Sequence, residues 1–70
     1  MEELSLDGRE FIALCDLLKR TGMCDNGGHA KAMIGEGLVK VNDNVELKKR
    51  CKITVNQVVE YNGQSVKVLE

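Results

Sequence analysis

Basic residues are concentrated in one short stretch of this chain. Five of the thirteen residues at positions 40–52 are Lys or Arg, although the net charge of all 70 residues is only −1. Two acids share the stretch, so it is locally +3, whereas positions 1–10 carry four acids and one Arg and are locally −3. Charges sorted in this way predict an electropositive surface suited to phosphate groups, unless they only keep a strand in solution. The basic residues are Lys40, Lys48, Lys49, Arg50 and Lys52.

Alternation along a strand would place three of these cations on one side. If residues 45–55 are extended, Lys48, Arg50 and Lys52 point to one face, and the apolar residues point to the other. Arg50 is expected to contribute most, because its planar guanidinium can bind a phosphate through two hydrogen bonds or stack on an unpaired base. Lys49 reaches the same surface only if the segment twists or forms a loop.

Size and composition exclude several classes of protein. Seventy residues suffice for one domain, residues 1–70, and leave no room for a separate catalytic domain. Apolar residues at 43% and charged residues at 30% are typical of a folded globular chain. No apolar run approaches the roughly 18 residues of a membrane span, and acids stand where a signal peptide would be basic and then apolar. We therefore expect a cytoplasmic protein without membrane contact.

Potential nucleophiles and metal ligands are few and scattered. Cys15, Cys24 and Cys51 lack the paired spacing of a disulfide framework or a zinc site, and His29 is the single histidine. Cys15 and Cys51 are expected to be buried, and Cys24 to be exposed among polar loop residues. No carboxylate pair or catalytic triad stands at a plausible spacing. The sequence therefore predicts no catalytic residue, no metal, no cofactor and no small-molecule substrate.

The order of elements indicates an α+β domain. A brief strand near residues 4–6 precedes helices predicted at about 13–21 and 28–36, and Asp25 or Asn26 is suited to cap the second helix. Strands are predicted at 38–41 and 45–55 around a turn at 42–44, and at 58–61 and 64–69 around Asn62-Gly63. The predicted fold is two short helices packed on one side of a small, mostly antiparallel sheet, a helix-turn-helix followed by β-hairpins.

Candidate phosphate contacts also surround the start of the second helix. Glycines there leave backbone amides unobstructed at the positive end of the helix dipole, so a phosphate could sit against Gly27, Gly28 and His29. The same glycines could instead only relieve a strained turn. Lys31 is placed away from the buried stripe, either to reach a phosphate or as an ordinary solvated lysine.

Three further residues complete the candidate set. Lys40 alternates out of the strand that contains Val39 and Val41. Asn42 offers a donor and an acceptor to a ribose or base edge, or only makes the turn. Lys19 either extends the basic surface or only complements the dipole at the end of the first helix.

An ordered set of short motifs runs through about two thirds of the chain, residues 14–59. Its members are Leu14, Leu17, Leu18, Lys19 and Gly22, then Gly27, Gly28, Ala30 and Lys31, then Ile34, Gly37, Val39, Val41 and Asn42, and finally Glu46, Lys48, Lys49, Arg50 and Lys52. Their spacing resembles the RNA-binding domain of the fourth protein of the small ribosomal subunit, hereafter the S-four family. Much of that family has Ser-Arg where this chain has Asn26 and Gly27, so the chain looks like the family's small stand-alone bacterial branch.

The resemblance implies a ribosome-associated protein that binds RNA through an alpha-L motif, the second helix and the adjoining hairpin, with no chemistry of its own. Aromatic residues make up only 3% of the chain, so stacking of single-stranded bases is disfavoured. The expected partner of the monomer is structured RNA, such as ribosomal RNA or tRNA. The alternative is a protein-interaction adaptor that uses the basic face or the edge of the C-terminal hairpin.

Overall fold

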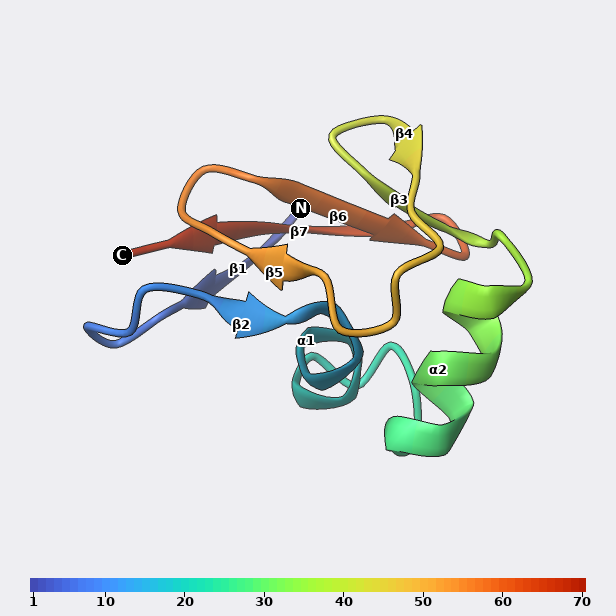
Figure 1. Ribbon diagram of the computed structural model, residues 1–70. Coiled ribbons are helices and arrows are strands. Elements are labelled where there is room, and N and C mark those ends of the chain that lie inside the picture. Colours follow the sequence, from blue (N-terminus) through green and yellow to red (C-terminus); the bar gives the residue numbers. More distant parts are fainter.

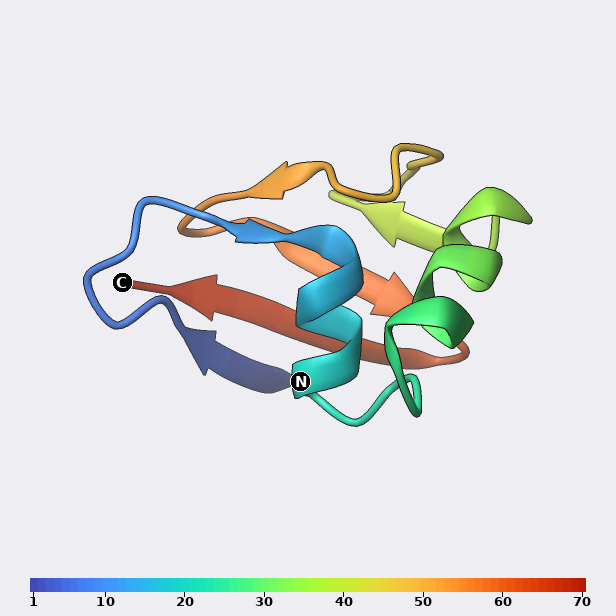
Figure 2. The same cartoon turned by 60° about the horizontal axis from the view of Figure 1, so that its bottom comes forward.

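A five-stranded sheet and two helices form the two layers of the protein, shown in a computed structural model that describes all 70 residues (Figure 1). Across the sheet the strands are β1 (Glu2–Ser5), β7 (Gln64–Leu69), β6 (Val58–Tyr61), β3 (Val39–Val41) and β4 (Asn44–Val45). The helices α1 (Leu14–Arg20) and α2 (Gly27–Gly35) lie on one side of the sheet, and Figure 2 shows them in front of it. A second, two-stranded sheet pairs β2 (Ile12–Ala13) with β5 (Lys52–Ile53) next to the start of α1.

Apolar side chains from both layers meet in one core between the helices and the sheet. Strand residues alternate, so that in β3 Val39 and Val41 point inward while Lys40 is exposed. Because every second strand residue faces the helices, the other face of the sheet is left open to solvent. The fully buried side chains are Val39, Val59, Val66 and Val68 from the sheet, Ile53 from β5, Leu14, Cys15, Leu17, Leu18, Ala30 and Ile34 from the helices, and Cys24 from the segment between the helices.

Two tight turns set the register of the antiparallel strands. Asn62 and Gly63 have φ values of 52° and 77°, and Asn42 and Asp43 have values of 50° and 68°. Two consecutive residues with positive φ define the hairpin turn that matches the twist of the flanking strands, and Asn, Asp and Gly adopt it most readily. The hairpin predicted around Asn62-Gly63 is confirmed, and the turn predicted at 42–44 forms at Asn42 and Asp43 and leads into the two-residue strand β4.

The class of the fold and the order of the helices and main-sheet strands agree with the sequence analysis, whereas β2 and its pairing with β5 were not predicted. Both helices lie within two residues of their predicted bounds, and the sheet is antiparallel except where β1 runs parallel to β7. The α+β fold of two helices on a mostly antiparallel sheet is therefore confirmed. No helix is both long enough and apolar enough to cross a lipid bilayer.

The C-terminal hairpin of β6 and β7 has a neighbour on each side. β1 pairs with β7 over four residues, and β3 pairs with β6 over three. The hairpin therefore offers no free edge, and the alternative that used this edge to recruit a partner chain is wrong. The free edges of the sheet belong to β1 and β4 instead.

The long strand predicted for residues 45–55 does not form. Only Asn44–Val45 and Lys52–Ile53 are strands, and the residues between them form a loop. The backbone of that loop bonds to groups outside the sheet: the Leu14 amide donates to the carbonyl of Cys51 at 2.9 Å, and the Cys15 amide donates to that of Lys49 at 3.1 Å. These bonds bend the chain toward α1, so Lys48, Arg50 and Lys52 do not form a stripe along a strand.

Cys24 is buried, contrary to the expectation from its polar neighbours. The segment after α1 folds back on the helix, where the Cys24 amide donates to the Leu18 carbonyl at 3.0 Å, and its side chain enters the core beside Met23. Burial, with a smaller contribution from Asp25, raises the pKa of the Cys24 thiol. Cys15 is buried as expected, and Cys51 is partly buried.

Candidate nucleic-acid interface

Residues 46–51, called the basic loop below, are held from three directions. The Glu46 amide donates to the Val39 carbonyl at 3.0 Å, which ties the start of the loop to β3. Inside the loop, the Lys48 amide donates to Oε2 of Glu46 at 3.0 Å, and the Cys51 amide donates to the Lys48 carbonyl at 3.2 Å. Near the end of the loop, the carbonyls of Lys49 and Cys51 accept hydrogen bonds from the Cys15 and Leu14 amides in the first turn of α1. A surface loop bonded in this way presents its side chains from a defined backbone.

The cations of this region point into solvent. Lys48, Lys49, Arg50 and Lys52 are all exposed. The side-chain hydrogen bonds of the loop come from Glu46 and Cys51, and they leave the ammonium and guanidinium groups available. Lys52 differs from the others, because its Nζ atom lies 4.9 Å from the centre of the Phe11 ring, a cation–π contact that fixes its direction.

The basic loop lies against the C-terminal half of α2. A methyl group at Gly35 would be 3.5 Å from Cε of Lys49, so the Lys49 side chain passes over this turn of the helix. The last turn of α2 has no basic residue of its own. Lys49 therefore also brings a positive charge to the negative end of that helix dipole.

One face of α2 connects its N-terminus with the basic loop. Residues four apart on a helix are neighbours, so Gly27, Lys31 and Gly35 lie in one row, which ends at Lys49. The row is about 12 Å long at the rise of an α-helix. Lys31 and Gly35 are exposed, and Gly27 is partly exposed. Lys31 and the basic loop therefore belong to one continuous surface.

The N-terminus of α2 is capped by a side chain and open above its first two amides. Oδ1 of Asn26 accepts a hydrogen bond from the His29 amide at 2.8 Å, which confirms Asn26 as the cap. The Gly27 and Gly28 amides have no partner within the helix. A side chain at Gly27 would meet nothing within 4 Å, whereas one at Gly28 would lie 3.3 Å from the capping oxygen. The side of Gly27 on which a Cβ would lie is therefore open.

His29 turns toward the loop that precedes the helix. Its Nδ1 atom accepts a hydrogen bond from the Asp25 amide at 3.2 Å, and the ring is partly buried. With Nδ1 used as an acceptor, the neutral ring keeps one N–H, at Nε2, for another group. His29 therefore stabilises the turn before α2, and a single donor, Nε2–H, is left for a ligand.

Lys40 lies on the other side of the sheet. Val39 and Val41 point to the helices, so Lys40 points to the open face, where Glu60 and Val45 are its cross-strand neighbours. The structure therefore separates Lys40 from the cations of the basic loop and α2. The expectation of a single surface that includes Lys40 is not met.

The Asn42 side chain has a structural role in the β3–β4 turn. Its Oδ1 atom accepts a hydrogen bond from the Val58 amide at 2.9 Å, and its φ of 50° makes the turn. The carbonyl of the side chain is thus occupied, and the amino group remains exposed. Lys19, at the exposed end of α1, stands with Arg20 in the last turn, where both complement the helix dipole.

The sequence analysis did not predict two features of this region. The first is the role of Glu46, an acid within the basic run, whose carboxylate accepts a hydrogen bond from the loop backbone. Three exposed apolar side chains, Leu38, Val45 and Leu47, surround Gly37 and the edge strand β4. The position of Glu46 within a cluster of cations was a sequence signal for its structural role. The grouping of the exposed apolar side chains is revealed only by the geometry of the loop.

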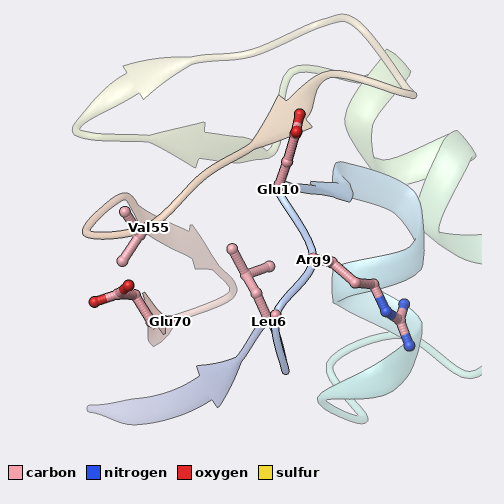
Figure 3. A pocket seen from close by; sticks show the side chains of 6 residues that line it. Leu6, Arg9, Glu10, Val55 and Glu70 are labelled. Carbon is pink, nitrogen blue, oxygen red and sulfur yellow. The ribbon is translucent and has the colours of Figure 1, made fainter.

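A hollow of about 310 Å³ lies at the far end of the molecule, near the C-terminus (Figure 3). It is bounded by Leu6, Gly8, Arg9, Glu10, Val55 and Glu70. Its charged lining residues are two acids, Glu10 and Glu70, and one base, Arg9, whose side chain points away from Val55 and Glu70 in Figure 3. This hollow is unsuited to phosphate and is separate from the basic loop.

Comparison with known proteins gives one family and close relatives. The family model of the S4 domain matches residues 4–69, a longer span than the motifs at 14–59. The protein YbcJ of Escherichia coli (strain K12) is 46% identical over 69 residues, which are 99% of each chain, and YbcJ of Shigella flexneri gives the same values. The solution structure of YbcJ from E. coli, described as revealing an alfaL motif involved in RNA-binding, has a TM-score of 0.78 and covers 100% of this chain and 89% of that chain.

Proposed function

The chain belongs to the S4 domain family, and on this basis we propose that it is a non-enzymatic protein that binds structured RNA through the N-terminus of α2 and the basic loop. The observation that carries the proposal is the continuous surface along one face of α2, from the open amide of Gly27 through Lys31 to Lys49 and Arg50. Cations and free amides at fixed positions suit the phosphates of a folded RNA backbone.

Each part of the surface has its own role in this proposal. Lys31, Lys48 and Lys49 bind phosphates as point charges, and Arg50 binds one with two hydrogen bonds. The Gly27 and Gly28 amides donate hydrogen bonds to a phosphate at the positive end of α2, with Nε2 of His29 beside it. Lys52 extends the surface beyond the basic loop, and Lys19, in the last turn of α1, is assigned a supplementary phosphate contact. Lys40 and Asn42 lie outside it and make no primary contact.

Structured RNA is favoured over single strands by the composition of the surface. Bases of single strands are held by stacking on aromatic rings, and the chain has only Phe11 and Tyr61. Phe11 is partly covered by Lys52, and Tyr61 packs against the core. We therefore propose recognition of phosphate and shape in ribosomal RNA or tRNA, by a monomer in the cytoplasm.

The adaptor hypothesis survives only in its basic-face form, because the hairpin edge is covered. An acidic partner protein would use the same cations as RNA. Pull-down from a lysate before and after nuclease treatment separates the two: a partner that RNA bridges is lost after nuclease, and a directly bound acidic protein is retained.

Filter binding to a labelled RNA hairpin at two salt concentrations tests the proposal. If about six phosphates are neutralised, the affinity should fall roughly a thousandfold between about 50 mM and 200 mM salt. Poly-uridine serves as the single-stranded comparison and is expected to bind more weakly than the hairpin at each concentration. Affinity for the hairpin that does not change with salt would refute the proposal, and tighter binding to poly-uridine would refute the preference for structured RNA.

A further inference from the structure

Glu46 carries the same sign of charge as RNA and is the first residue of the basic loop, within the proposed interface. Electrostatics alone predicts that this carboxylate weakens RNA binding, since it lowers the positive potential of the basic loop. Its place in the hydrogen-bond network suggests the opposite effect. The two effects can be separated by experiment.

The carboxylate of Glu46 organises the first half of the basic loop. Oε2 accepts from the Lys48 amide at 3.0 Å, while the Glu46 amide is anchored to the Val39 carbonyl at 3.0 Å. One residue thus joins β3 to the backbone of the first loop cation. The Lys48 carbonyl in turn accepts the Cys51 amide at 3.2 Å, which closes the turn that displays Lys49 and Arg50.

The same carboxylate also lies beside the Cys51 thiol at the end of the loop. Burial is the main cause that raises the pKa of Cys51; the charge of Glu46 and a hydrogen bond with it add to the rise, and Lys48 opposes it. Glu46 therefore bonds to the Lys48 amide at one end of the turn, and its charge acts on the Cys51 thiol at the other end. Removal of its side chain would leave that turn with only its own backbone bond and the two bonds to α1.

We propose that Glu46 is a positioning residue for RNA binding: its carboxylate holds the Lys48 amide, and the basic loop thereby presents Lys48 and Arg50 in one arrangement. This inference rests on the proposed RNA-binding function. A loop that is ordered before binding loses less conformational freedom in the complex, and this gain exceeds the repulsion between Glu46 and the phosphates.

Two substitutions with the same change of charge test the proposal. Glu46→Gln removes the negative charge but keeps a side-chain oxygen that can accept from the Lys48 amide, whereas Glu46→Ala removes both. We expect Glu46→Gln to bind a labelled RNA hairpin at least as tightly as the wild type. Glu46→Ala should bind about three- to tenfold more weakly than Glu46→Gln, although both variants gain one unit of positive charge.

The control is Glu3→Ala, which removes an acid from β1 at the opposite edge of the sheet. Four inter-strand spacings separate β1 from β4, about 19 Å, which exceeds the screening length at physiological salt. Its affinity should stay within about twofold of the wild type. Equal gains in affinity for Glu46→Ala and Glu46→Gln would overturn the proposal and make Glu46 a simple counter-charge.

A second measurement needs no RNA. Hydrogen exchange at the Lys48 amide should be faster in Glu46→Ala than in the wild type, and unchanged in Glu46→Gln, with the melting temperature similar in all three. Unchanged exchange in Glu46→Ala would refute the positioning role even if the protein binds no RNA. Conversely, Arg50→Ala and Lys31→Ala could leave binding to the RNA hairpin unaltered while Glu46→Ala still accelerates exchange at the Lys48 amide. In that case the proposed RNA-binding function fails, and the role of Glu46 in holding the loop stands.

Discussion

Arg50→Glu is expected to lower the affinity for a labelled RNA hairpin about one hundredfold, because a bidentate phosphate contact is replaced by a repulsive charge. Arg50 is exposed in the basic loop, and its guanidinium makes no contact that the fold requires. The free energy of unfolding should therefore change by less than about 0.5 kcal/mol. Fluorescence anisotropy with the hairpin, together with urea unfolding, measures both quantities on the same sample.

The matched control for this prediction is Lys67→Glu. Lys67 lies in β7 on the open face of the sheet, opposite Glu3, so its reversal changes the net charge by the same amount away from the basic loop. We expect RNA affinity to fall by less than about threefold, since the site is remote and screened. Equal losses for Arg50→Glu and Lys67→Glu would mean that net charge alone drives binding, which would contradict an interface at the basic loop.

Asn42→Ala is expected to destabilise the protein by about 2 kcal/mol without weakening RNA binding by the folded form. About half of this comes from the lost acceptor for the Val58 amide, and about half from a positive φ that alanine adopts with strain. For a domain of this size that is a large share of the total stability. Thermal and urea unfolding measure the loss.

Asn42→Asp and Asn42→Gly divide the effect into its two causes. Asp keeps an acceptor for the Val58 amide and tolerates the left-handed backbone, so it should retain most of the stability. Gly adopts the positive φ without strain but still lacks an acceptor for the Val58 amide. The stability of Asn42→Gly should therefore fall between that of the wild type and that of Asn42→Ala. An Asn42→Ala protein that keeps full stability and loses RNA affinity would show that the side chain contacts RNA instead.

Local sequence signals predicted most of the fold. Asn62-Gly63 and Asn42-Asp43 have few alternatives to a tight turn, because their residue types favour positive φ, and they fixed the hairpins correctly. The second helix, predicted at about 28–36 and found at 27–35, was recognised from its apolar spacing and from the two possible caps Asp25 and Asn26, of which Asn26 is the cap. Such features depend on neighbours within a few positions, which the sequence displays directly.

The errors arose where distant residues decide the outcome. Residues 45–55 alternate like a strand, but the carbonyls of Lys49 and Cys51 bond to the amides of Cys15 and Leu14, more than thirty positions away. No periodicity reveals a partner at that separation. Cys24 was misplaced for the same reason, since the polar residues beside it hide the return of the chain to α1.

The candidate site was predicted in its parts but not in its arrangement. The cations of the basic loop and Lys31 were identified from charge and spacing, and the contact of Lys49 with Gly35 brings them together. Lys40 was correctly expected to point away from Val39 and Val41, yet its separation from the helix-side surface depends on which face the helices cover. That choice is made by tertiary packing.

In this account, one set of side chains stabilises the fold and a different set binds RNA, although both sets lie on the same segments of the chain. Asn42 and Asn26 use their side-chain oxygens to complete the backbone, whereas Arg50 and Lys31 have no structural partner and remain exposed. Glu46 links the two groups, because it completes the backbone of the loop that displays the cations. Variants of the first group should alter unfolding, and variants of the second should alter RNA affinity.

The most direct test of the interface is a titration of ¹⁵N-labelled protein with an unlabelled RNA hairpin, followed by the amide signals in NMR spectra. We expect the signals of Gly27, Gly28, Lys31 and residues 48–52 to shift together, while those of Lys40, Glu60 and Lys67 on the open face of the sheet stay in place. Shifts confined to the open face, with the basic loop and the start of α2 unchanged, would contradict the proposed binding surface.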